Sequence, residues 1–322
     1  MEGRLAAMFV DTDGRQGLEM AAEKGKSGMK KRKYQMSRVH MSWKFCLCVV
    51  GVVLLCSCSR FQGSFDKISL SAWLCDSREE LQQMGESASA YSVMAGFQDM
   101  EWFAVLLPLL ASFGSVTDFA GQWFSGYYYA DVSRKTYRRY AAGWLIRSAL
   151  LGFASVVLGI LLYFLLVSCK FPHYGEFGLD AGNSMIAMAY GDTAGKRFWS
   201  LLLAVFHTGL LAAVLAILAV ALTVFCKDAF FAVSSLALVG YFSIKLDSAF
   251  TGAISMQYFN LGQEIPMVYK IISFFFPSNH LYYTHNFSAQ YGVGYWLYLV
   301  FLGLLAAGIW LWFYRMVKRR NG

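Results

Sequence analysis

The amino-acid sequence predicts an all-α polytopic membrane protein with six transmembrane helices and both termini in the cytoplasm. Apolar residues make up 57% of the 322 residues and charged residues only 15%, whereas a soluble domain carries about 25% charged residues. Six apolar runs approach or reach the roughly 20 residues that a helix needs to cross a bilayer. Basic residues gather in the segments that these runs place on one side of the membrane.

The six predicted spans differ in length. The runs at 142–168, 198–225 and 295–313 are long enough to cross a bilayer as helices. Three other runs are shorter, and Pro108 interrupts the second of them; they lie at 45–58, 102–117 and 229–244. Together the six runs place residues 44–322 in a single membrane domain.

The first 43 residues form a polar, basic tail without a periodic apolar face. The tail contains four consecutive basic residues, Lys30 to Lys33, and we expect it to be disordered. An alternative is that translation begins further along the chain, at Met29, Met36 or Met41.

The distribution of Lys and Arg predicts the orientation. With a cytoplasmic N-terminus, six spans place residues 1–44, 118–147, 226–228 and 314–322 at the inner face, and these segments hold 20 of the 28 basic residues. The outer segments hold the other eight although they include the longest loops. Cytoplasmic loops carry an excess of Lys and Arg, so helix count and charge count indicate the same topology. The net charge of +8 is explained by this orientation, and we expect no nucleic-acid partner.

No motif for a cofactor, a metal or a nucleotide is recognised. Gly25-Lys26-Ser27 is similar to the end of a phosphate-binding loop, but Met20 stands where the pattern requires its first glycine. The seven cysteines show no metal-binding spacing, and we expect them to be structural. The chain is therefore expected to be no enzyme and to hold no cofactor.

The strongest candidate site is the segment between the second and third predicted spans. Phe119, Trp123 and Tyr127 are four residues apart, so a helix over this segment would carry an aromatic side and lie in the membrane interface. The candidate coupling or interfacial residues are Asp118, Trp123, Gly126, Arg134, Lys135, Tyr137, Arg138 and Arg139. The segment is either an anchor whose cations meet lipid phosphates or an element that also contacts a cytoplasmic subunit, and the residues alone leave both open.

Charge is nearly absent from the predicted spans. Only Arg147 and His207 lie inside them, and Arg147 is close enough to the inner face to extend its head group toward it. Ion-coupled transporters usually carry acidic residues at membrane depth. A transporter with this sequence would draw its energy from a partner, most simply an ATPase.

These residues resemble the ABC-2 family of transporter permeases, in particular the small bacterial type of Firmicutes-like species. Asp118 stands where the family usually has Glu at the end of the second span, Gly126 follows, and residues 133–137 form the basic-aromatic Ser-Arg-Lys-Thr-Tyr stretch. The family often has a Lys shortly after that Tyr, whereas Ala141 and Ala142 stand here. The resemblance covers about residues 95 to 320.

The resemblance implies the permease subunit of an exporter in the bacterial cytoplasmic membrane. Its partners would be a separate cytoplasmic ABC-type ATPase, a second permease copy and membrane lipids. Small residues on span four (Ala204, Thr208, Ala212, Ala216) and on span six (Gly303, Ala307) would pack within the chain or between copies. Two other classes stay open: a membrane-embedded enzyme, and a lipoprotein-like membrane protein with Cys58 lipidated.

Overall fold

The computed structural model describes nine stretches of the chain, one of them the pair 70–71, and a few single residues. The other stretches are 43–58, 60–61, 64–68, 101–134, 136–171, 194–226, 228–254 and 295–321. The chain divides into two units, Met1–Lys44 and Phe45–Gly322, and the helical bundle belongs to the second. The predicted tail, 1–43, lies outside the described residues apart from Trp43.

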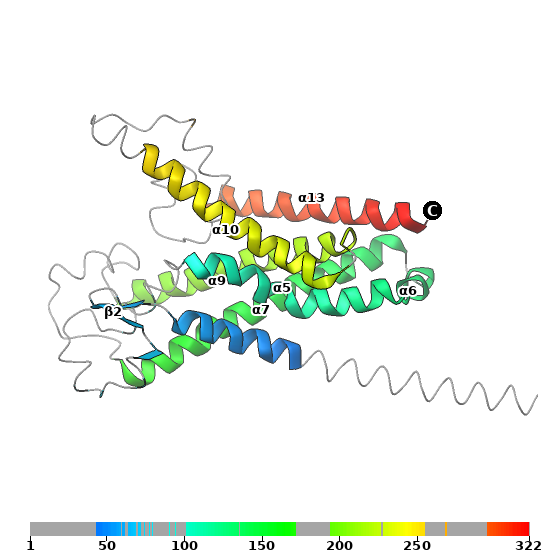
Figure 1. Cartoon of the computed structure of the whole chain (residues 1–322). Coiled ribbons are helices and arrows are strands. Elements are labelled where there is room, and N and C mark those ends of the chain that lie inside the picture. The colour runs from blue at the N-terminus through cyan, green and yellow to red at the C-terminus, as the bar shows by residue number, and fades with distance from the viewer. Residues whose placement is uncertain are drawn as a thin grey trace, which may run out of the picture. The chain divides into compact units, whose positions relative to one another are not determined.

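Helices dominate the second unit (Figure 1), as the sequence predicted. They are α5 (Glu101–Phe124), α6 (Tyr128–Arg134), α7 (Tyr137–Lys170), α9 (Ala194–Thr223), α10 (Ala229–Ile254) and α13 (Tyr295–Asn321). A further apolar helix spans Trp43–Ser57. A short antiparallel hairpin of β1 (Arg60–Phe61) and β2 (Ser64–Ile68), which the sequence did not predict, follows that helix.

Four helices are long and apolar enough to cross a membrane. These segments are Tyr137–Lys170, Leu201–Thr223, Ala229–Leu246 and Trp296–Arg319, and they correspond to the third to sixth predicted spans. The helix Trp43–Ser57 is shorter: at 1.5 Å per residue it reaches about 22 Å, less than the roughly 30 Å of a hydrocarbon core. The 24-residue α5, which contains Pro108, is not among the four.

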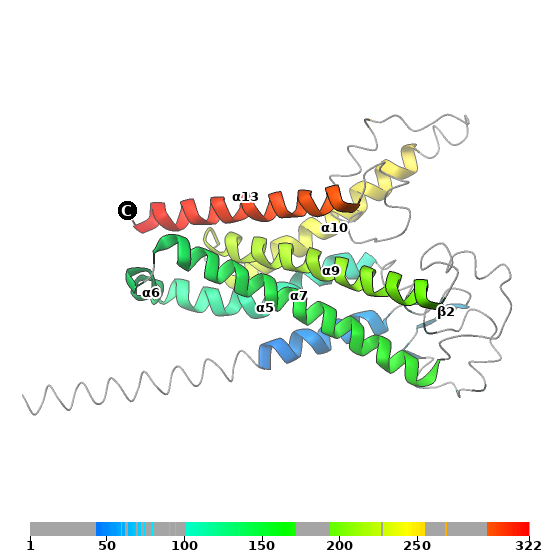
Figure 2. The ribbon, with the colours of Figure 1, turned by 180° about the vertical axis from the view of Figure 1, so that it is seen from behind.

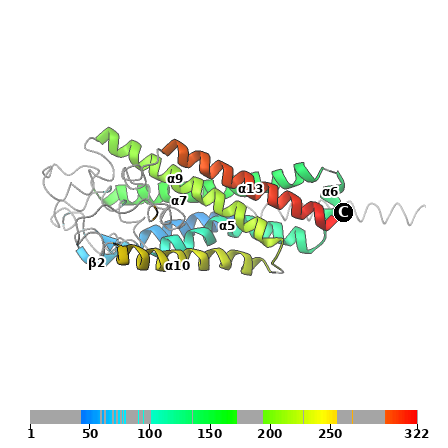
Figure 3. The same ribbon diagram turned by 90° about the horizontal axis from the view of Figure 1, so that it is seen from above.

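The long helices run in alternating directions. Figures 1 and 2 show that α5, α9 and α13 end, and that α7 and α10 begin, toward the end of the bundle where α6 lies. Helix α9 packs against α5, α7, α10 and α13, and Figure 3 shows it running through the bundle between its neighbours. In its most apolar stretch 61% of the residues are buried, against 39% or less in the corresponding stretches of the other three candidate spans, so α9 is the central helix.

Hydroxyl side chains inside these helices bond to their own helix. Ser112 Oγ donates to the carbonyl of Pro108 at 2.6 Å, Thr208 Oγ1 to that of Ala204 at 2.9 Å and Thr223 Oγ1 to that of Ala219 at 2.8 Å. A polar group in hydrocarbon is costly without a hydrogen bond. These internal bonds make the polar positions of α5 and α9 compatible with an apolar surrounding.

Helices α7 and α9 approach closely at glycine and alanine. A Cβ atom added at Gly152 would lie 2.8 Å from the Cβ atom of Ala216 and 3.1 Å from the carbonyl oxygen of Ala212. The four small residues of α9 (Ala204, Thr208, Ala212 and Ala216) are all fully or almost fully buried. They therefore pack within the chain, which was one of the two alternatives left open by the sequence.

Candidate functional site

The candidate site lies where α5, α6, α7 and α13 meet. Helix α5 does not stop at the predicted end of its span but continues through Asp118 to Phe124. Gly126 then takes a positive φ of 74°, a conformation that residues with a Cβ atom rarely adopt. This turn separates α5 from the seven-residue α6, and α7 begins at Tyr137.

Asp118 and Arg147 form an ion pair between α5 and α7. Arg147 Nη2 lies 3.6 Å from Asp118 Oδ2, and the two side chains are 40% and 19% exposed. The guanidinium also lies 5.2 Å from the centre of the Trp144 ring, a cation–π distance. Asp118 precedes the end of α5 by six residues, about 9 Å along the axis, so the pair lies well before the helix end, at the partly exposed side of the bundle.

An aromatic cluster packs beside this ion pair. The Phe119 ring centre lies 5.3 Å from that of Trp144 and 5.7 Å from that of Phe313, both edge to face. It also stacks on Trp123 at 5.6 Å, and Trp123 in turn lies 4.3 Å from Tyr128. All five rings are buried. We call these residues of α5, α6, α7 and α13 the aromatic junction.

The expected interfacial helix over 118–140 differs from the structure. The segment 118–124 belongs to α5, and the aromatic side that the four-residue spacing indicated faces the interior at Phe119 and Trp123, both buried. Tyr127, the third member of the series, falls in the turn and is exposed. The physical reason is that α7 and α13 supply partner rings, Trp144 and Phe313, for this face.

The other predicted residues surround the turn. Gly126 makes the turn, Arg134 is the last residue of α6, and Tyr137 begins α7 half-buried. Arg138 and Arg139 follow with exposed side chains. Lys135 lies outside the described residues.

Further exposed basic side chains lie at the same end of the bundle as these arginines. Helix α13 ends there with three exposed cations, Arg315, Lys318 and Arg319, and α13 packs against α7. Figure 2 shows the C-terminal end of α13 beside the start of α7. We call Arg138, Arg139, Arg315, Lys318 and Arg319 the basic rim.

The sequence did not predict the pairing of Asp118 with Arg147 or the contribution of Trp144 and Phe313, whereas Tyr128 belongs to the aromatic segment that the sequence indicated. The signal for the ion pair was present: a lone Arg near the start of the third predicted span follows an Asp at the end of the second, and the two spans are antiparallel neighbours. Phe313 carried no comparable signal, because many aromatic residues follow one another along α13.

Within the part of the chain that the structure describes, no group of three or more His, Cys, Asp or Glu side chains could hold a metal ion. His207 is fully buried on α9, and its ring lies 5.2 Å from that of Tyr298 on α13. His207 therefore occupies a packed position between two helices.

Four long apolar helices define the protein as a multi-span helical membrane protein. Comparison with family models, with curated proteins and with solved structures finds no match. The class of protein thus comes from the helices, and its function has to be argued from the site.

Proposed function

We propose that the protein is the membrane-spanning permease subunit of an ABC-type exporter, with six spans and both termini in the cytoplasm. In this proposal α5 and the helix Trp43–Ser57 complete the bundle formed by the four apolar helices. The membrane is the bacterial cytoplasmic membrane, and a separate ATPase subunit supplies the energy.

The directions of the helices support the topology. Because α5, α9 and α13 end at the same end of the bundle as α6 (Figure 1), the basic rim and the loop between α9 and α10 share one side. An excess of Lys and Arg marks the cytoplasmic side of a membrane protein. The side that carries the basic rim is therefore the cytoplasmic side in the proposal.

The observation that carries the proposal is the aromatic junction beneath exposed arginines. Arg138 and Arg139 stand within two turns of Trp144, which contacts Phe119, and Phe119 contacts Phe313. A subunit docked on the exposed cations could move the start of α7, and packed rings would pass that displacement to α5 and α13. A simple lipid anchor needs no such buried connection.

Helix α13 has an exposed face that a second permease copy could contact. Gly303 and Ala307 are exposed, and a Cβ atom at Gly303 would meet nothing within 4 Å. Small residues allow helices to approach closely in a membrane. Since the small residues of α9 are buried, we place the contact between copies on α13.

Packing of the helix Trp43–Ser57 weighs against a lipoprotein with Cys58 lipidated. Cleavage before Cys58 would remove this helix, yet Val52, Leu55 and Cys56 are buried in one core with residues of α5 and α7. A Cβ atom at Gly159 of α7 would lie 2.6 Å from that of Val52. In our proposal the helix therefore stays in the mature protein.

The test is purification of the tagged full-length chain from the membranes of its native host in a mild detergent. We expect an ATPase subunit with a phosphate-binding loop to co-purify. Arg138→Glu with Arg139→Glu should lose it while the chain still inserts in the membrane. The matched control is Lys170→Glu with Lys245→Glu, which reverses the charge of the last residue of α7 and of a residue at the far end of the apolar span Ala229–Leu246 of α10; it should keep the ATPase subunit. ATP hydrolysis by the purified chain without a second subunit would contradict the proposal.

A further inference from the structure

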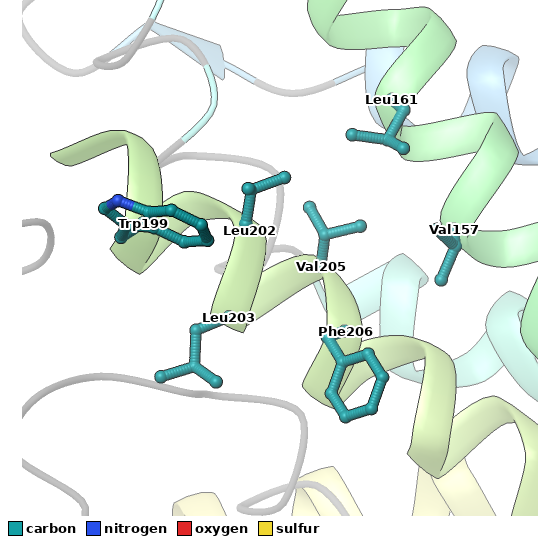
Figure 4. Close-up of a pocket in the computed structure, with 7 residues that line it drawn as sticks. All are labelled: Val157, Leu161, Trp199, Leu202, Leu203, Val205 and Phe206. Carbon is teal, nitrogen blue, oxygen red and sulfur yellow. The ribbon is translucent and has the colours of Figure 1, made fainter. Parts of the chain in front are cut away.

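An apolar groove runs between α7 and α9, away from the aromatic junction. Its volume is about 460 Å³, within the range of sites that hold small molecules. Figure 4 shows its lining: two side chains from α7 and five from α9. They are Val157, Leu161, Trp199, Leu202, Leu203, Val205 and Phe206.

The groove opens on the outer surface of the bundle. Neighbouring apolar side chains of α7, among them Leu158, Leu162 and Leu165, are exposed, as is Phe206 of α9. In a chain whose helices cross a membrane, such a surface faces lipid tails. The occupant therefore enters from the hydrocarbon and not from water.

Chemistry restricts what can fill the groove. Its described lining offers no charged side chain, and the indole N–H of Trp199 is its single polar side-chain group. Water there would lack hydrogen-bond partners, and an empty groove would lose the dispersion contacts of its walls. From Trp199 to Phe206 the groove extends about 10 Å along α9, enough for part of one acyl chain.

The first turns of α9 lie at the end of the groove where a lipid head group would be placed. Trp199 is 70% exposed, and Trp residues favour the level of the lipid head groups. Lys196 and Arg197 lie within one turn before Trp199, near the beginning of the helix at Ala194. Two basic residues in the first turn of α9, together with the N-terminus of a long helix, favour an anionic head group at this end of the groove.

We propose that this groove is a specific site for one anionic phospholipid, with an acyl chain between α7 and α9 and its phosphate at the first turn of α9, whose sequence includes Lys196 and Arg197. The site requires that the chain is embedded in a membrane but not that it works with an ATPase. In the six-span topology the lipid belongs to the outer leaflet.

The first test fills the groove. The full-length protein, reconstituted in vesicles, is irradiated with phosphatidylglycerol that carries a diazirine in the middle of one acyl chain, and labelled peptides are identified by mass spectrometry. We expect labels on residues 199–206 of α9. Leu161→Phe with Leu202→Trp should lower that labelling about tenfold, equivalent to about 1.4 kcal/mol of binding free energy. The matched control, Leu238→Trp on the exposed face of α10, should leave it unchanged.

The second test addresses the head group. Phosphatidylcholine with the same diazirine chain should label residues 199–206 several-fold less, and Lys196→Gln with Arg197→Gln should remove the difference between the two lipids. Equal labelling by both lipids would show ordinary contact with bulk lipid and overturn the proposal. Equal labelling of the wild-type protein and of the variant with Leu161→Phe and Leu202→Trp would do the same. Neither result bears on ATPase coupling, so the two proposals fail independently.

Discussion

The carboxylate of Asp118 on α5 meets the guanidinium of Arg147 on α7 at 3.6 Å, and the same guanidinium lies against the ring of Trp144. The two charges thus hold antiparallel helices together on one side of the turn at Gly126. Both lie inside helices, where each charge alone would be costly in a lipid surrounding.

Neutralising the acid should therefore remove the negative charge that Asp118 places beside Arg147. We expect Asp118→Asn to lower the free energy of unfolding by about 1 to 2 kcal/mol, a figure reduced from that of fully buried pairs because Arg147 is partly exposed. Arg147→Gln in the same protein should restore part of the loss. The measurement is a double-mutant cycle by unfolding in mixed detergent micelles; additive effects of the two substitutions would show that the pair contributes nothing.

The aromatic junction should be a centre of stability. Phe119→Ala removes a fully buried ring that contacts three others, and we expect a loss of about 3 kcal/mol. Phe231→Ala is the matched control, because Phe231 is 65% exposed on α10. The same unfolding assay compares them. Equal losses for the two substitutions would mean that the junction is not packed as described.

The sequence located much of this junction without predicting its form. The four-residue spacing of Phe119 and Trp123 indicated one aromatic side, and that side exists. The spacing alone does not say whether the aromatic side faces lipid head groups or another helix. One partner ring of Phe119 is Phe313, which is far from it in the sequence, so the spacing could not reveal this contact. Asp118 was taken as the end of a span since a charge in hydrocarbon is unfavourable, but α5 continues beyond it, and the Asp118 carboxylate is paired with Arg147.

Helix ends show the same limitation. The predicted span 229–244 stops before Lys245, but α10 continues to Ile254. Polar residues mark where a helix leaves the hydrocarbon, whereas the helix itself ends where its backbone bonds end. Apolar runs therefore predicted the helices and underestimated their lengths.

Close packing between α7 and α9 gives another prediction. Gly152→Ala should destabilise the protein by about 1 to 3 kcal/mol, because its Cβ atom would meet Ala216 and two backbone carbonyls at 3.1 Å or less. Gly303→Ala is the matched control: its Cβ atom meets nothing within 4 Å, and replacing a helical glycine by alanine stabilises by about 0.5 to 1 kcal/mol. If both substitutions stabilise the monomer in detergent, helices α7 and α9 do not approach each other at Gly152 as closely as described.

Cys226, in the short loop between α9 and α10, reports on the proposed topology. It lies toward the same end of the bundle as the basic rim. In a variant with all other cysteines replaced, an impermeant maleimide should label Cys226 only after the cells are permeabilised. A cysteine introduced at Arg319 should behave in the same way. Labelling of either position in intact cells would reverse the orientation.

The pH dependence of this labelling is set by the surroundings of Cys226. Partial burial, and then the negative charge of Asp228, raise the pKa of the Cys226 thiol above its ordinary value. Because the thiolate is the reactive form, labelling of permeabilised cells near neutral pH should be slow and should rise with pH beyond the point where labelling of an ordinary thiol levels off.

Asp228→Asn should lower the pKa of the Cys226 thiol and speed its labelling at a given pH. Asp228 Oδ1 also accepts a hydrogen bond from the backbone N–H of Phe230 at 3.0 Å, and Asn caps a helix about as well as Asp, so the helix start is preserved. Identical rate profiles for the two proteins would show that Asp228 does not influence the thiol.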